Sequence, residues 1–191
     1  MKFLKNPAVQ YLLLFGGVTL ALFSVLATPW ATKIFVQPFT QGLVHVCVLL
    51  LAPFDGRVEA IGDILRFTDG KGAVRVLSGC NAVEVCALLV AAIITFPAKF
   101  KYCLIGAVVG VVALQAVNLL RIITLLYLSR GSQEVFEFFH VYVWDAMIGL
   151  EGLLVFLFWA RWQGRKADAD KAAQAEAAQI SDHWLSKELY F

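Results

Sequence analysis

Long apolar runs separated by short polar stretches dominate the pattern along this chain. A helix rises about 1.5 Å per residue, so roughly 20 apolar residues cross the 30 Å or so of hydrocarbon in a bilayer. Runs of about this length predict helices at 9–27, 34–52, 80–96, 102–128 and 141–162. The expected fold class is therefore an all-α polytopic membrane protein, with residues 1–162 as a single integral-membrane domain.

The run at 34–52 differs from the others, because polar residues recur along one side of it. Gln37, Gln41 and His45 are spaced four residues apart and form one stripe of a helix. Such a helix either lies in the outer interface of the membrane or turns its stripe inward, towards the other helices. We expect an interfacial or re-entrant helix here, with the other four runs crossing the membrane.

Basic residues at the ends of the runs agree with four crossings. They are Lys2 and Lys5, Lys99 and Lys101, and Arg161, Arg165 and Lys166. With four crossings all of them face the cytoplasm, and 163–191 becomes an Ala-rich cytoplasmic tail. A cleaved signal peptide is the alternative for the first run, which we expect to be retained as an anchor.

Residues 53–79 form the main polar segment before the tail. Within it, Val58–Phe67 and Ala73–Leu77 favour strands, and the stretch between them is rich in turn residues. We expect a small extracytoplasmic β-hairpin at 57–77 that leads directly into Cys80. A solvated loop is the alternative.

The composition supports the membrane assignment. The chain is 60% hydrophobic and only 16% charged, whereas soluble domains carry about 25% charged residues. Its net charge of +2 arises from residues at segment ends, so it indicates no nucleic-acid partner. The four cysteines, Cys47, Cys80, Cys86 and Cys103, form no Cys-x-x-Cys pair, which argues against a zinc site or a thioredoxin-like relay. We expect no cofactor.

Three residues with reactive or charged side chains stand at a matching depth. Holding an arginine at the bilayer centre costs roughly 2.5 to 3.5 kcal/mol, so Arg121 within an apolar run indicates a functional site. Counted from the cytoplasmic ends of their runs, Cys80, Arg121 and His140 stand about 17, 20 and 21 residues up. All three therefore reach the outer end of the membrane.

These residue types suit acyl transfer through a thioester. The start of a helix and a nearby arginine favour the thiolate of Cys80. His140 can act as general acid and base, and Arg121 can stabilise the thiolate or an oxyanion. Expected supporting residues are Gly79, Asn81, Glu84, Asn118 and Trp144. Gln115 shares a helix face with Arg121, and Asp145, like Trp144, follows His140 by about one turn. Glu84 has an alternative role, as the ion-pair partner of Arg121.

Three short blocks resemble the signature blocks of the exosortase/archaeosortase family, in its compact form similar to exosortase H. They are Gly79–Glu84, Asn118–Ile122 and Phe139–Trp144, within a similarity over about 58–159. The resemblance implies a cysteine transpeptidase of the bacterial cytoplasmic membrane, with Cys80 as nucleophile and Arg121 and His140 as its partners. Many members have glycine where this chain has Ala82.

The substrates implied by the resemblance are exported proteins whose C-terminus holds a short motif, a transmembrane helix and a basic cluster. Such a helix would dock from the bilayer, with the hairpin and the polar stripe as candidates for the rim of the cleft. The motif, the acceptor amine and the oligomeric state stay open.

Two other classes of function remain open from the sequence. Cys80, His140 and His45 are candidate ligands of a heme or soft metal in a binding protein, which an absorption spectrum would detect. Alternatively, Arg121 and Glu84 form a structural pair in a small transporter or assembly subunit. In that case Cys80 would be dispensable.

Overall fold

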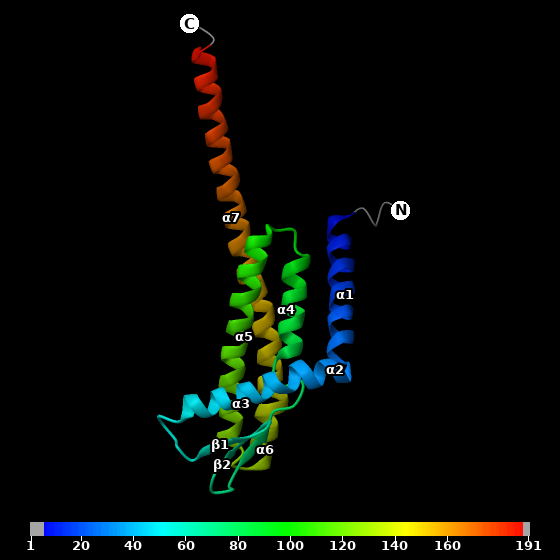
Figure 1. Cartoon of the computed structure of the whole chain (residues 1–191), viewed down its shortest axis with the longest axis vertical. Helices are drawn as coiled ribbons and strands as arrows, with labels where there is room; N and C mark the ends of the chain where they lie inside the picture. The colour runs from blue at the N-terminus through cyan, green and yellow to red at the C-terminus, as the bar shows by residue number, and fades with distance from the viewer. Residues whose placement is uncertain (1–5, 189–191) are drawn as a thin grey trace. The chain divides into compact units, whose positions relative to one another are not determined.

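A computed structural model describes residues 6–188, with side chains described as far as residue 179 (Figure 1). Its elements in chain order are α1 (Pro7–Leu26), α2 (Pro29–Ala31), η2 (Thr32–Val36), α3 (Gln37–Leu51), β1 (Val58–Ile61), β2 (Ile64–Phe67), β3 (Ala73–Arg75), α4 (Val83–Thr95), α5 (Phe100–Leu128), α6 (Gln133–Glu137), η3 (Phe138–Trp144) and α7 (Asp145–Glu188). The η segments are π-helices. Lys2, Lys5 and the last three residues of the predicted tail lie outside the described residues.

The chain divides into two compact units, Met1–Phe156 and Leu157–Phe191. The described part of the second unit is the distal portion of α7. The sheet and the candidate site lie in the first unit.

The described chain is mostly helical, as predicted, and four of its helices are long and apolar enough to cross a membrane. These four are Pro7–Leu26, Pro29–Leu51, Phe100–Leu128 and Gln133–Gln179. They differ from the predicted set, because α4 has only 13 residues and falls short by length. A turn at its start and Pro97 just beyond its end limit α4, although it packs against α1 and α5.

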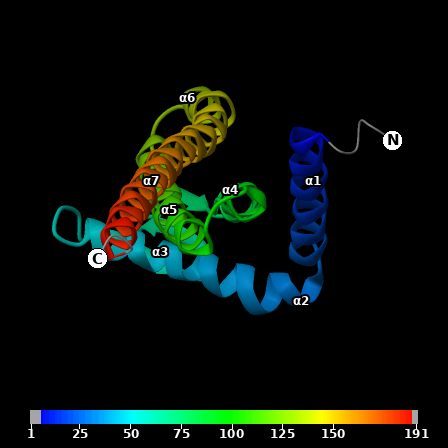
Figure 2. The ribbon, with the colours of Figure 1, turned by 90° about the horizontal axis from the view of Figure 1, so that it is seen from above.

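The helix predicted to be interfacial runs across α4 and α5 rather than alongside them (Figures 1 and 2). Its buried side includes Val44 and Cys47, while Gln37, Gln41 and His45 are exposed. The alternative in which the polar stripe turns inward is therefore wrong. Apolar residues occupy the inward side because that side covers the sheet and the end of α5.

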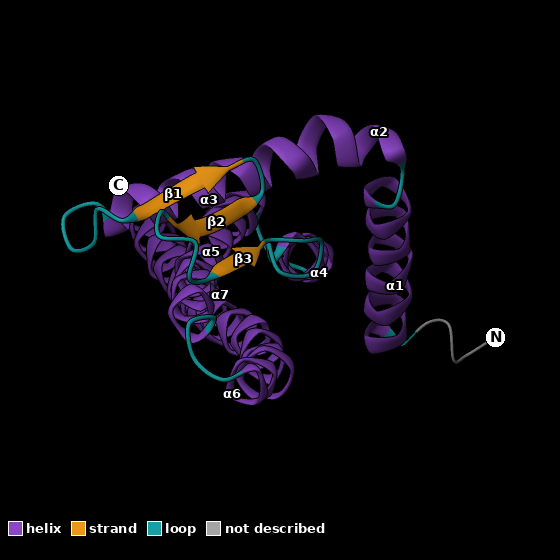
Figure 3. Ribbon diagram, turned by 90° about the horizontal axis from the view of Figure 1, so that it is seen from below, coloured by secondary structure: helices purple, strands orange, loops and turns teal. Residues whose placement is uncertain are grey.

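The polar segment forms a three-stranded antiparallel sheet in the order β1-β2-β3, instead of the single hairpin predicted (Figure 3). The predicted first strand, Val58–Phe67, is broken by a two-residue turn at Gly62 and Asp63, where Ile61 pairs with Ile64. Gly62 has a φ of +61°, which glycine adopts without the steric penalty of a Cβ. One glycine therefore turns one long strand into two.

The main hydrophobic core lies between the sheet, α3 and the distal end of α5. Leu65 and Phe67 of β2 are fully buried there, and Val74 of β3 joins them. Full burial of such a side chain contributes roughly 1.5 to 3 kcal/mol. Cys80 packs against this core from its edge, so the core fixes the position of the residue predicted to react.

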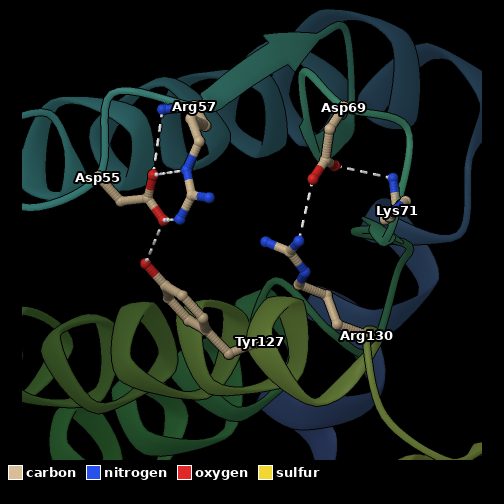
Figure 4. Close-up of polar contacts among 6 residues, drawn as sticks. All are labelled: Asp55, Arg57, Asp69, Lys71, Tyr127 and Arg130. Atoms are coloured by element: carbon tan, nitrogen blue, oxygen red, sulfur yellow. Dashed lines mark hydrogen bonds and ion pairs between the residues drawn. The ribbon is translucent and has the colours of Figure 1, made fainter.

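Two polar contacts fasten the sheet to the end of α5 (Figure 4). Asp55 accepts hydrogen bonds from Arg57, at 2.9 Å, and from the Tyr127 hydroxyl, at 3.3 Å. Asp69 pairs with Arg130 at 2.9 Å. The hydrogen bonds from Arg57 hold the pKa of Asp55 at about 2. The backbone N–H of Lys71 and then the charge of Arg130 lower the pKa of Asp69.

Candidate active site

Cys80 lies in a tight loop before α4, not in the first turn of the helix as predicted. Helix α4 begins at Val83, whose N–H donates to the Asn81 side chain at 3.1 Å. Ala82 has a φ of +56°, a left-handed conformation that stops the helix from extending back to Cys80. The helix macrodipole is therefore less directly available to the thiol than the sequence suggested.

Glu84 and Gly79 close this loop. The Glu84 carboxylate accepts a hydrogen bond from the Gly79 N–H at 3.2 Å. Gly79 has a φ of +87°, so a residue with a side chain would be strained there. The alternative pairing of Glu84 with Arg121 is not what the structure shows, because Glu84 is engaged by the loop backbone and Arg121 by another acid.

A buried polar chain holds the loop against the neighbouring helices. Asn81 is fully buried, and its side-chain amide donates to the Thr40 hydroxyl of α3 at 2.9 Å. From α5, the Gln115 side chain donates to the Asn81 carbonyl at 3.0 Å. Asn118, one turn further along, donates to Gln115 at 3.3 Å. Asn81 and Asn118 thus position the loop rather than face the thiol.

The three residues predicted to react together lie side by side. The Cys80 Sγ is 3.5 Å from the His140 Nε2 and 4.0 Å from the Arg121 Nη2. They come from the loop before α4, from α5 and from η3, respectively, so only the fold brings them together. Their catalytic role stays a prediction, but the geometry is that of a nucleophile with a proton carrier and a cation in reach.

Asp145 completes the group as the partner of Arg121. Its carboxylate accepts from the Arg121 Nη2 at 2.8 Å. The Arg121 side chain is only 2% exposed, whereas that of Asp145 is 58% exposed. The pair therefore neutralises a deeply buried cation with an anion that still reaches the surface.

The π-helix η3 explains how both His140 and Asp145 reach the site. An α-helix turns about 100° per residue, so residues five apart would lie about 140° apart around its axis. Hydrogen bonds from i to i+5 widen the turn and place such residues on one face. The residue that α-helical spacing favoured, Trp144, instead packs into the core. Asp145 was thus noted from the sequence only as a neighbour of His140.

A cavity of about 200 Å³ opens beside the reactive group. Cys80, Arg121 and His140 line it together with Phe136 and with residues 73–77, which are β3 and the two residues after it. The His140 ring stacks on Phe136 with centroids 5.7 Å apart, which limits its rotation. Within the described chain, the Arg121 Nε and Nη1 are buried and have no hydrogen-bond partner.

The remaining candidates lie away from this cavity. His45 is exposed on α3 and its Nδ1 contacts the Gln41 carbonyl at 2.7 Å, so it does not join Cys80 and His140. Cys47, Cys86 and Cys103 are buried and free. Among the residues that the structure describes, no group of three or more His, Cys, Asp or Glu side chains is arranged to hold a metal ion.

The arrangement can carry out nucleophilic acyl transfer, because a thiol, a base and a buried cation converge beside a cavity. Comparisons of the chain with protein-family models, with curated proteins and with solved structures find no match.

Proposed function

We propose that this protein is a membrane-embedded cysteine peptidase or transpeptidase of the exosortase kind. It removes the C-terminal sorting signal of exported proteins through a thioester at Cys80. The observation that carries the proposal is the contact of the Cys80 Sγ with the His140 Nε2, at 3.5 Å, and with the Arg121 Nη2, at 4.0 Å. The three signature blocks in the sequence support the same assignment.

The reaction follows from these contacts. His140 takes the thiol proton as the Cys80 Sγ attacks the carbonyl carbon of the scissile peptide bond. The C–N bond then breaks, and His140 returns the proton to the leaving amine. Water, or an acceptor amine, attacks the thioester, releases the new C-terminus and restores the thiol.

Arg121 stabilises the negative charge that develops on the carbonyl oxygen. Arg121 lines the cavity, and its Nη2 lies 4.0 Å from the Cys80 Sγ. A cation at this distance attracts the oxyanion more strongly as its charge develops, which favours the transition state over the ground state. Asp145 keeps the guanidinium in place by accepting from Nη2, the same nitrogen that lies near the Cys80 Sγ.

The proposed setting is the bacterial cytoplasmic membrane, with the site on the extracytoplasmic face. In this arrangement α1, α5 and α7 cross the bilayer. The shorter α4, which packs against α1 and α5, extends only part of the way. Helix α3 lies in the outer interface with its polar stripe towards water. The sheet then rests on the outer face, and 163–191 lies in the cytoplasm. A substrate helix approaches from the lipid and presents its motif at the cavity.

Processing in cells tests the proposal directly. New C-termini would be mapped by mass spectrometry on exported proteins that end in a transmembrane helix and a basic cluster, in cells that produce the protein. We expect Cys80→Ala to abolish these termini, whereas Cys86→Ala, a matched change six residues further along in α4, leaves them in place. Unchanged processing by a normally inserted Cys80→Ala protein would overturn the proposal.

A further inference from the structure

Strand β3 has one unpaired edge. It is one of the two outer strands of the sheet, and among the described residues it pairs only with β2. Phe67 donates to the Gly72 carbonyl and Val76 donates to the Asp63 carbonyl, at 3.1 and 2.9 Å. In an antiparallel pair, residues alternate between those bonded to the partner strand and those facing away. Gly72, Val74 and Val76 therefore face β2.

It follows that Ala73 and Arg75 direct their backbone N–H and C=O groups away from β2. In the described part of the chain these groups have no hydrogen-bond partner. An open strand edge is a template for a further strand and is normally shielded. Helix α6 lies on the open side of β3, away from β2 (Figure 3).

The open edge is also a wall of the candidate active site. Residues 73–77 line the cavity together with Phe136 and His140, and the thiol of Cys80 opens into the same space. A peptide that binds in this cavity at the Sγ of Cys80 therefore lies beside the unpaired backbone of β3. The five residues of this wall extend over about 17 Å at roughly 3.3 Å per residue.

We propose that the substrate segment around the scissile bond binds as an extended fourth strand on the free edge of β3. This inference rests on the proposed peptidase function and specifies how that site holds its substrate. Backbone groups of Ala73 and Arg75 pair with every second residue of the segment, as in other cases of strand addition. This pairing positions the carbonyl of the scissile peptide bond at Cys80 and does not depend on the side chains of the substrate.

Arg75→Pro removes one backbone N–H that points away from β2 and removes no hydrogen bond to β2. Proline is tolerated on an edge strand where its nitrogen faces away from the sheet, and Val74 before it is already extended. Arg75→Ala is the matched control, because it also removes the ion pair of Arg75 with Asp63 but keeps the N–H. The difference between the two variants isolates the backbone bond.

Two probes are used. The first is a short electrophilic peptide, acetyl-trialanine chloromethyl ketone, and the second is iodoacetamide, which has no peptide backbone that could pair with β3. Their rates of reaction at Cys80 would be followed by mass spectrometry on the full chain. We expect Arg75→Pro to slow the peptide roughly three- to ten-fold relative to Arg75→Ala, with iodoacetamide unchanged. Equal peptide rates in the two variants, with iodoacetamide labelling intact, would overturn strand addition.

A second measurement uses the unmodified protein, so it holds even if Arg75→Pro misfolds. The nitrogens of the peptide probe are methylated one at a time. Strand pairing predicts slower labelling of Cys80 at every second position only, whereas equal effects at all positions, or none, contradict it. Failure of iodoacetamide to label Cys80 at all would count against the peptidase itself, which separates the two proposals.

Discussion

Arg121 is the residue on which the proposed chemistry most depends, and Asp145 is what makes its burial tolerable. Removing one partner of a buried ion pair leaves an uncompensated charge. The charge that removal of Asp145 would leave is that of Arg121, whose side chain is only 2% exposed, so solvent screens it little. The expected effect therefore concerns stability as well as activity.

We predict that Asp145→Ala lowers processing at least roughly ten-fold and lowers the unfolding free energy by about 3 kcal/mol, because the buried Arg121 loses its anion. The reason is that the guanidinium loses its 2.8 Å contact and drifts from the Cys80 Sγ. Glu134→Ala, an exposed acid on α6, is the control and should change neither quantity. Normal processing by Asp145→Ala would show that Arg121 needs no positioning partner.

The loop before α4 depends on two residues in left-handed backbone conformations. At Gly79, with a φ of +87°, a Cβ would meet nothing within 4 Å, so any penalty there is purely conformational. We predict that Gly79→Ala destabilises the protein by about 1 to 2 kcal/mol. At Ala82, with a φ of +56°, the relief of strain offsets the lost methyl and the added chain entropy. Ala82→Gly should therefore stay within about 1 kcal/mol of neutral.

Denaturant unfolding of the two variants in detergent measures both effects. Equal losses in Gly79→Ala and Ala82→Gly would contradict the assignment of strain to the backbone.

At the scale of elements, much could be read from the sequence because it depends on local composition. Apolar runs gave the long helices, and the depth of Arg121 and His140 along their runs anticipated their meeting with Cys80. The crosswise direction of α3 fits its polar stripe. These inferences depend on periodicity and length, which the sequence displays directly.

Other elements depend on contacts between distant segments and were missed. Nothing in the local sequence indicates the i to i+5 hydrogen bonds of η3. The sequence therefore favoured Trp144 as the supporting residue, whereas in the structure Asp145 contacts the site. The structure has three strands instead of a single hairpin because Gly62 has a positive φ. This conformation forms the turn that allows Ile61 to pair with Ile64. The late start of α4 depends on the side chain of Asn81, which is held from α3.

The hydrogen bond between α3 and the loop before α4 can be tested alone. Thr40→Val keeps the shape of the side chain but leaves the Asn81 amide buried without its acceptor. We predict a loss of about 1 to 3 kcal/mol in unfolding free energy. Thr124→Val is the control, because its hydroxyl bonds only the Leu120 carbonyl of its own helix. A loss as small as that of Thr124→Val would show that Asn81 finds another partner.

The attachment of the sheet to α5 should depend on pH through Asp55. Its pKa is about 2 in the folded protein, below the ordinary value of 3.8. A depressed carboxyl pKa adds stability that is complete above the ordinary value and is lost as pH falls through the lower one. We predict that Asp55→Asn is less stable than the unmodified protein above pH 4, and that the difference disappears near pH 2.

Unfolding free energies of the two proteins between pH 2 and 6 provide the check. A difference that is independent of pH over this range would show that Asp55 acts through its shape rather than its charge.

At the scale of the whole molecule, the reactive group lies where the helices meet the sheet. Apolar helices carry Arg121 and His140 to the same end of the first unit, and the sheet covers that end. In a membrane, this arrangement would let a substrate arrive from the lipid while its cleavage site lies at the aqueous boundary. The site would thus be open to a tethered protein and to water at once.

The central claim is that Cys80 is an activated nucleophile on the extracytoplasmic face. The most direct test is the rate at which a membrane-impermeant maleimide labels Cys80 in vesicles of known orientation, compared between the unmodified protein and Arg121→Ala. The account predicts labelling from the extracytoplasmic side, slowed at least roughly ten-fold in Arg121→Ala. Labelling only from the cytoplasmic side, or equal rates in the two proteins, would contradict it.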